Sequence, residues 1–348
     1  MVVSRSACAL AAVWLLSVLP ADVADAQDVA AELRIRVMQD GIPARGALVA
    51  LLDDTGGLIA EALTSEDGYR LFRAGPGTYR VRIRRIGYAP YTSETFTLPR
   101  ADELVLQPVS PAVVLAGVIV SARPACAPVG DTAAVAPAWD EIAKALRASQ
   151  LTTADLTGIG TVRTWRRETN TTGRVTLSDT ASFVVTDRRP FWSRDPAELA
   201  RSGYVRGDEF RGFQYHGPDE TVLLSQEFVT THCFALVRDS GRQGMLGVEF
   251  EPLPRRRVSD IAGVLWLDEA TSELRELEFR YVNAGYPMFF SPGGSARFVR
   301  MPSGAWLVAD WRIRAPRLRR QGVQPNPAFL GWIETGGRIE LPGEDGGP

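Results

Sequence analysis

The sequence predicts a mainly β protein: an N-terminal β-sandwich, then a short helix, then a second, curved antiparallel β-sheet. Apolar and polar residues alternate with a period of two in both halves of the chain, which is typical of strands with one wet face. Glycine- and proline-rich turns separate these runs at short intervals. Helical spacing of apolar residues is clear in one segment only, at residues 139–150.

The first alternating run follows residue 31, where Leu33, Ile35 and Val37 share one face and charged residues occupy the other. The run around Tyr79 has the same form, with arginines between its apolar residues. Turn signals at Asp67-Gly68 and elsewhere divide this region into short strands. The pattern predicts a β-sandwich.

The segment DGIPARGALVALLDDTGGLIAEALTSEDGYRLFRAGPGTYRVRIRRIGYAP, residues 40–90, resembles the carboxypeptidase regulatory-like domain, whose fold is a transthyretin-like β-sandwich. The elements that carry the resemblance are the IPARGALVAL strand, the TSEDGYRLF hairpin, the AGPGTYRVRI turn and strand, and RRIGYAP. It extends over residues 31–122, and AGVIVSARP, residues 116–124, is expected to form the last strand of the sandwich and its exit. The resemblance implies a fold and names no activity, because such domains accompany proteins of many functions.

The ends of the chain and one interruption set the expected domain boundaries. Residues 1–26 carry an early Arg5, an apolar run at 7–19 and small residues at Ala24 and Ala26, the layout of a secretory signal peptide cleaved after Ala26. The Pro- and Ala-rich residues 123–138 predict a linker. Residues 139–342 then form a β-rich C-terminal domain with one short helix at its start, in which Asp140 and Glu141 occupy the first turn.

The C-terminal domain is expected to form long hairpins, and Pro302-Ser303-Gly304 marks the turn of the last predicted pair. In DIAGVLWLDEATSELRELEFRY one strand ends at Asp268, and Leu277, Phe279 and Tyr281 line one face of the return strand. Leu274 breaks this parity, so we expect a bulge or the strand start between Leu274 and Leu277. Aromatic residues on the concave face of this sheet form the candidate binding surface: Trp266, Phe279, Tyr281 and Trp311. The alternative is that all these rings belong to the core.

Composition weighs against several classes of function. A net charge of −2 argues against general nucleic-acid binding, which depends on neutralising phosphates. No run after residue 27 is apolar for long enough to cross a bilayer, so no transmembrane span is expected. The chain has two histidines, His216 and His232, and their spacing fits no zinc peptidase motif; neither a metal nor another cofactor is expected.

The cysteines predict a disulfide. Cys8 would leave with the signal peptide, so Cys126 and Cys233 remain in an oxidising compartment. A bond between them would attach the linker to the second sheet and, by closing a long loop, would stabilise the fold by about 4 to 5 kcal/mol before strain is counted. Two free thiols are the alternative.

Two functions follow from these features. The first is an exported, non-enzymatic binding or scaffolding protein of a bacterial cell envelope, either periplasmic or secreted, whose partner is an envelope protein, a glycan or an apolar ligand. The second is an exported hydrolase that acts on glycan or peptide through a site in the C-terminal domain, built from His216, Asp219 or Glu220.

Overall fold

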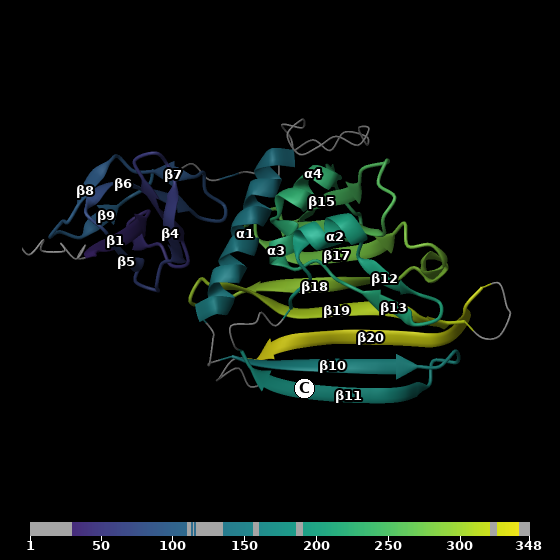
Figure 1. Ribbon diagram of the computed structural model, residues 1–348. Coiled ribbons are helices and arrows are strands. Elements are labelled where there is room, and N and C mark those ends of the chain that lie inside the picture. The colour runs from purple at the N-terminus through teal and green to yellow at the C-terminus, as the bar shows by residue number, and fades with distance from the viewer. Residues whose placement is uncertain are drawn as a thin grey trace, which may run out of the picture.

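The computed structural model describes residues 30–109, 113, 115, 135–155, 160–185, 191–320 and 326–340. The predicted signal peptide, Cys126 and most of the predicted linker lie outside these residues. The same holds for residues 116–124, which the sequence predicts as the last strand of the sandwich. Within the described residues the predicted mainly β architecture is confirmed (Figure 1).

The N-terminal part is a β-sandwich of two sheets. One sheet has the order β2-β1-β5, with β9 added beside β1, and the other has the order β4-β3-β6-β7, with β8 added beside β6. The bounds of the nine strands are β1 Ala31–Gln39, β2 Ile42–Pro43, β3 Leu48–Asp53, β4 Leu58–Leu63, β5 Tyr69–Ala74, β6 Gly77–Arg84, β7 Tyr91–Thr92, β8 Phe96–Leu98 and β9 Leu104–Leu106.

The alternation in the sequence determines which side chains fill the sandwich. Leu33, Ile35 and Val37 are completely buried, while the residues between them face solvent. Tyr79 and Val81 of β6 pack into the same core. Gly68 lies at the turn before β5 with a φ of +69°, a conformation that glycine adopts without strain.

The C-terminal part is built on one nine-stranded antiparallel sheet in the order β11-β10-β20-β19-β18-β17-β16-β15-β14. The sheet is strongly curved (Figure 1). The strand bounds are β10 Thr161–Thr169, β11 Val175–Val184, β14 His232–Val237, β15 Met245–Pro252, β16 Asp260–Asp268, β17 Leu274–Val282, β18 Gly293–Arg300, β19 Trp306–Arg319 and β20 Ala328–Glu340.

The β16–β17 hairpin has the predicted bulge. Leu265 pairs with Leu277 and Trp266 with Glu276, but Leu267 pairs with Leu274, so that Arg275 is the extra residue. The bulge returns Leu274 to the buried face, on which Leu277 also lies. The parity break in the sequence therefore predicted a real irregularity of the sheet.

The expectation of one short helix at residues 139–150 needs correction. The first helix, α1, runs over Val135–Asp155 and so begins inside the predicted linker; Pro137 is compatible with this start, because the first turn has no backbone N–H bonds to lose. Asp140 and Glu141 consequently lie beyond the first turn. Short helices and one further hairpin follow: α2 Pro196–Ser202, β12 Val205–Asp208, β13 Gly212–Tyr215, α3 Glu220–Leu223, α4 Gln226–Thr231 and the 3₁₀ helix η2 Tyr286–Phe290.

The helices cover only part of the concave face. Helix α1 packs across β14 to β17 and reaches β19, and Ile142 and Leu146 enter the main core. In Figure 1 the other α-helices lie on the same side, toward β14 to β17, and none lies beside β10 or β11. All ten residues of β11 are exposed. The sheet is therefore a packed core at one end and an open concave surface at the other.

Helix α1 also joins the two parts of the chain. The Nζ atom of Lys144, the only lysine of the protein, donates to the carbonyl oxygen of Tyr88 at 2.9 Å, to Glu141 at 2.7 Å and to Asp140 at 2.9 Å. Glu141 in turn accepts from the backbone N–H of Gly87 at 2.7 Å. No helix in the described ranges is long and apolar enough to cross a membrane.

Candidate binding site

The four aromatic residues of the predicted binding surface do not lie together. Phe279, Tyr281 and Trp311 lie on the concave face and belong to the main core, where they are 5%, 0% and 7% exposed. The rings of Phe279 and Tyr281 meet edge to face at a centroid distance of 5.6 Å. Trp266 projects from the opposite face of the sheet.

Trp266 has a separate environment on that convex face. The guanidinium of Arg242 lies 4.8 Å from the centroid of the indole ring. The indole N–H donates to Glu278 at 3.0 Å, and Arg242 forms an ion pair with the same carboxylate. These contacts account for the burial of Trp266 without any ligand.

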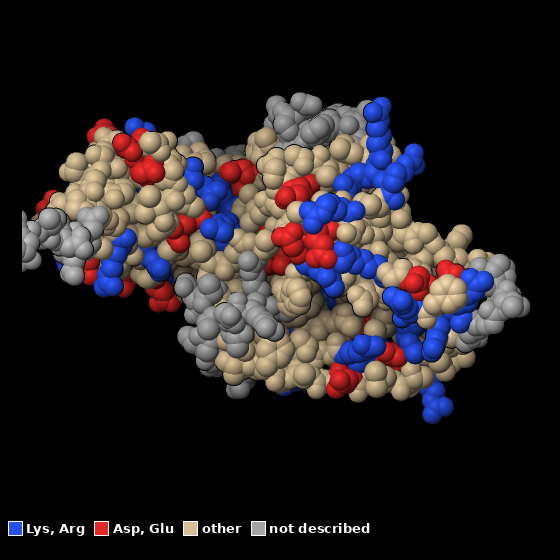
Figure 2. Space-filling model, viewed as in Figure 1, with Lys and Arg blue, Asp and Glu red and all other residues tan. Residues whose placement is uncertain are grey.

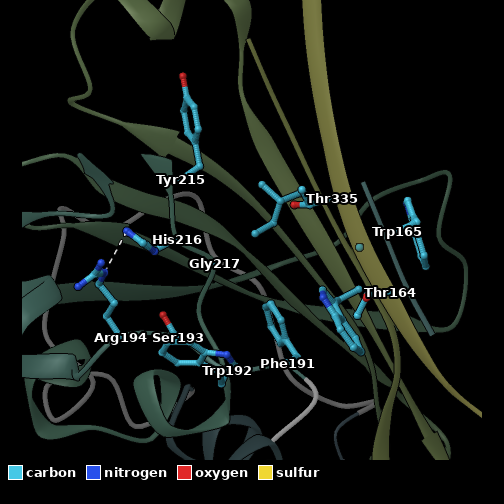
Figure 3. Close-up of a pocket in the computed structure, with 13 residues that line it drawn as sticks. Thr164, Trp165, Phe191, Trp192, Ser193, Arg194, Tyr215, His216, Gly217 and Thr335 are labelled. Atoms are coloured by element: carbon cyan, nitrogen blue, oxygen red, sulfur yellow. Dashed lines mark hydrogen bonds between the residues drawn. The ribbon is translucent and has the colours of Figure 1, made fainter. Parts of the chain in front are cut away.

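Trp311 is the member of the predicted set that lines a cavity. The cavity has a volume of about 480 Å³ and lies where the helices stop covering the concave face (Figure 3). Trp311 and Ile313 of β19 and Thr335 of β20 form its floor. Phe191 stacks on Trp311 at a centroid distance of 5.5 Å and lines the cavity beside it. Trp192 is 66% exposed beside it.

Two adjacent glycines of β20 leave space for the rings of two tryptophans from the neighbouring strands. A Cβ atom on Gly337 would lie 2.3 Å from the ring of Trp311, and one on Gly336 would lie 2.4 Å from the ring of Trp165. Neighbouring residues of a strand point to opposite faces, so the two rings lie on opposite sides of β20. Figure 3 shows Trp165 beyond β20, away from the other residues that line the cavity. The ring of Trp311 therefore belongs to the cavity floor, whereas Trp165 borders the cavity with its ring on the other side of β20.

One end of the cavity is polar. The Nε–H of Arg194 donates to Nε2 of His216 at 3.2 Å (Figure 3). A neutral His216 ring that accepts at Nε2 carries its proton on Nδ1. Burial, followed by repulsion from Arg194 and Arg206, lowers the pKa of His216 below its ordinary value. The ring is therefore neutral near pH 7.

Asp219 positions the segment that carries the polar end. One of its carboxylate oxygens caps helix α3 by accepting from the N–H of Val222 at 2.9 Å. The other accepts from the backbone N–H of Ser193, also at 2.9 Å. The hydroxyl of Ser193 lines the cavity and is buried, with no hydrogen-bond partner within the described part of the chain.

The three residues of the predicted hydrolase site have different surroundings. His216 lines the cavity, but the carboxylate of Asp219 is occupied by two backbone N–H groups. Glu220 is buried on the side of α1, where it accepts from the hydroxyl of Ser149 at 2.7 Å. The described geometry thus pairs His216 with an arginine and engages both carboxylates elsewhere.

His232 and Cys233, adjacent in sequence at the start of β14, both have structural surroundings. His232 is 1% exposed, and its two ring nitrogens lie 3.0 Å from the carbonyl oxygen of Phe228 and 3.2 Å from that of Ile261. The sulfur of Cys233 lies 3.3 Å from the carbonyl oxygen of Glu251. Cys126 lies outside the described residues, so its bond with Cys233 stays a prediction. No group of three or more potential metal ligands occurs among the residues that the structure places.

Comparison with known proteins identifies the N-terminal part. Residues 32–109 match the family model of the carboxypeptidase regulatory-like domain, in agreement with the two-sheet sandwich. This segment is a carboxypeptidase regulatory-like domain. The match ends at residue 109, and the predicted boundary at 122 falls beyond the continuously described part of the sandwich.

The other comparisons add little to the regulatory-like domain. No curated protein matches the chain. Among solved structures, a 9R-lipoxygenase from Cyanothece PCC8801 aligns with 11% identity and a TM-score of 0.18, over 91% of this chain and 43% of the lipoxygenase. The chain thus spans less than half of that protein, and a TM-score of this size carries no argument about fold or function.

Sequence analysis missed most of the cavity because its residues come from distant segments. Phe191, Trp192 and Arg194 lie in FWSRDP, ahead of a helix that was not predicted. One local signal was present: Asp195, Pro196 and Glu198 match the start of a helix, with Asp195 accepting from the N–H of Glu198 at 3.0 Å. Recognition of this cap would have predicted that the rings of Phe191 and Trp192 lie close to the start of a helix.

Proposed function

We propose that the protein is exported to a bacterial cell envelope and binds a small apolar ligand in the cavity of its C-terminal domain. The observation that carries the proposal is the cavity itself, about 480 Å³ in volume, with Trp311 and Ile313 on its floor and Phe191 beside Trp311. It is also lined by Thr164, Ser193, Arg194, Tyr215, His216 and Thr335, so the cavity combines aromatic surface with polar groups, which is the usual form of a small-molecule site. Of the partner classes that the sequence leaves open, an apolar ligand suits this site best.

Export rests on the sequence of residues 1–26, with its early Arg5, its apolar run and its small residues before Gln27. Binding is preferred to hydrolysis because the carboxylates closest in sequence to His216 serve the fold: Asp219 caps a helix and Glu220 bonds to Ser149. The regulatory-like domain packs on α1 and in this proposal acts as a scaffold for the binding domain.

The test is a fluorescence titration of the mature protein with N-phenyl-1-naphthylamine, a neutral aromatic probe that brightens in apolar sites. We expect saturable binding at one site. Trp311→Ala removes the floor ring and should weaken binding roughly tenfold to a hundredfold, the value of a buried aromatic contact.

The matched control is Trp332→Ala, the same substitution at a tryptophan of β20 that does not line the cavity. It should leave the affinity close to that of the unchanged protein, while circular dichroism and thermal melting check that both variants fold. Absence of saturable binding, or equal affinity in folded W311A, would overturn the proposal.

A further inference from the structure

The cavity has two chemically different ends. Phe191, Trp311 and Ile313 form its apolar end, and Ser193, Arg194 and His216 form its polar end. Figure 3 shows Arg194 and His216 side by side, with Phe191 and Thr335 farther along the cavity. A ligand that fills the cavity therefore meets an apolar surface with its body and polar groups with its head.

The polar end offers hydrogen-bond donors. Arg194 has five N–H donors, of which Nε–H bonds to His216 and Nη1 bonds to Glu198 at 3.2 Å. The hydroxyl of Ser193 is buried without a described partner, and the neutral His216 ring is a donor at Nδ1. No aspartate or glutamate is among the residues that line the cavity. This set of groups favours an acceptor-rich head group.

Basic and acidic side chains are interspersed over the face of the molecule shown in Figure 2, but the charged group that lines the polar end of the cavity is the guanidinium of Arg194. Glu198 is the carboxylate paired with Arg194, and it is also paired with Arg206. A second carboxylate, that of Asp219, accepts from the backbone N–H groups of Ser193 and Val222, so the nearby charges balance in number. Neither carboxylate lines the cavity, whereas Arg194 does, so the charge presented to a ligand is that of its guanidinium group. Because Arg194 is only partly exposed, at 37% of its side chain, this charge is incompletely screened by solvent.

We infer that the cavity accepts an amphipathic organic anion, with an aromatic or aliphatic body against Trp311 and a singly charged head group at Ser193 and Arg194. This inference rests on the proposed function, because it specifies the ligand class of the same site. The head group displaces no internal partner of Ser193 and adds to the two described bonds of Arg194. Carboxylate and sulfonate groups share the required chemistry.

The experiment compares two probes with the same aromatic body. 1-Anilinonaphthalene-8-sulfonate is N-phenyl-1-naphthylamine with one added sulfonate, so the ratio of their dissociation constants measures the contribution of the anionic head. We expect the sulfonate probe to bind more tightly to the full mature protein. Arg194→Gln should weaken binding of the sulfonate probe about tenfold, the loss expected for a charge-assisted hydrogen bond, and should weaken binding of the neutral probe much less.

Two further variants make the result specific. Arg194→Lys retains the positive charge and should keep most of the preference for the sulfonate probe. Arg201→Gln removes an exposed arginine from the same segment and should change neither probe. Retained binding of the neutral probe shows that R194Q is folded.

The outcomes separate the two proposals. Saturable, Trp311-dependent binding of the neutral probe with no preference for the sulfonate, or a preference that survives in R194Q, overturns the anionic ligand and leaves the proposed function standing. If the unchanged protein shows no saturable binding of the neutral probe, both the proposed function and the anionic ligand class are overturned.

Discussion

Trp311 and Trp266 show how one residue of register separates a binding residue from a structural one. Both are nearly buried tryptophans of the same sheet, yet Trp311 faces the cavity and Trp266 faces Arg242 and Glu278 on the other side. Strand parity in the sequence already distinguishes Trp266 from Leu265 and Leu267, which enter the core. The presence of aromatic residues in these strands suggests a common surface, but the alternation of side chains along each strand is the better criterion for which face a residue occupies.

His216 gives the site a predictable response to pH. Burial, repulsion from Arg194 and Arg206, and the weaker opposing effect of Glu198 together leave its pKa lowered. As the pH falls through this lowered pKa, the ring gains a proton and the polar end gains a positive charge. The affinity for the sulfonate probe should therefore rise at acidic pH, while that for the neutral probe stays constant in the same titration.

The variant His216→Gln should abolish the acid-dependent rise. The free energy of unfolding changes in the opposite direction from the affinity as the pH falls. Because the unfolded chain takes up the proton at a higher pH than the folded protein does, the contribution of His216 to stability should fall as the pH drops below the ordinary value of 6.5. An acid-dependent rise that persists in H216Q would assign the effect to another group.

At the scale of elements, β11 is expected to be the least protected strand of the sheet. It pairs with β10 alone, and all ten of its residues are exposed, so little apolar burial opposes its local opening. Hydrogen exchange followed by mass spectrometry should show faster exchange in residues 175–184 than in 293–300, which form a strand paired on both sides. Equal protection of the two strands would show that β11 opens only with the whole domain.

Sequence alternation predicted individual strands well because each strand of an antiparallel sheet has its own face pattern. It predicted the β16–β17 hairpin and its bulge, and also the turn at Pro302–Gly304, where Gly304 has a φ of +88°. It could not place β20 between β10 and β19, since no local pattern specifies a pairing between segments so far apart. The cavity floor depends on that pairing, which is why the sequence predicts Trp311 as a binding residue but not the other residues of the floor.

The short helices escaped prediction for a different reason. Helices α3 and α4 are too short to show an apolar period, and side-chain caps mark their starts. Asp219 accepts from Val222 and Ser225 accepts from Phe228, each three residues ahead. Cap residues are therefore a better guide than periodicity for elements of this length.

For the whole molecule, the predicted Cys126–Cys233 disulfide remains to be tested. Mass spectrometry of the exported protein under non-reducing conditions should find a linked peptide pair two protons lighter than the reduced pair. The physical basis is an even count of cysteines in an oxidising compartment, with Cys233 fixed in β14. Alkylation of both thiols without reductant would contradict it.

The junction between the two parts should depend strongly on Lys144. Its ammonium group is 1% exposed and satisfied by three acceptors, while Glu141 is completely buried beside it. Lys144→Ala leaves a buried carboxylate without its main partner, which typically costs about 3 to 5 kcal/mol of unfolding free energy. The control Arg297→Ala breaks a largely exposed ion pair with Asp310 and should cost about 0 to 1 kcal/mol of unfolding free energy. Denaturant unfolding of both variants measures the difference. Equal losses of unfolding free energy in the two variants would contradict a stabilising junction.

The enclosed position of Lys144 also allows separation of the two domains to be followed by chemical labelling. Because the protein has a single lysine and its amine is enclosed between α1 and the loop at Tyr88, an acylating reagent should leave that amine unmodified in the native state and modify it when the domains separate. Labelling at Lys144 over time would therefore report the rate of domain opening without any engineered probe. Because Lys144 carries the protein's one side-chain amine, a dye attached to it after partial unfolding would mark a defined point between the regulatory-like domain and the binding domain, distinct from the N-terminal α-amine.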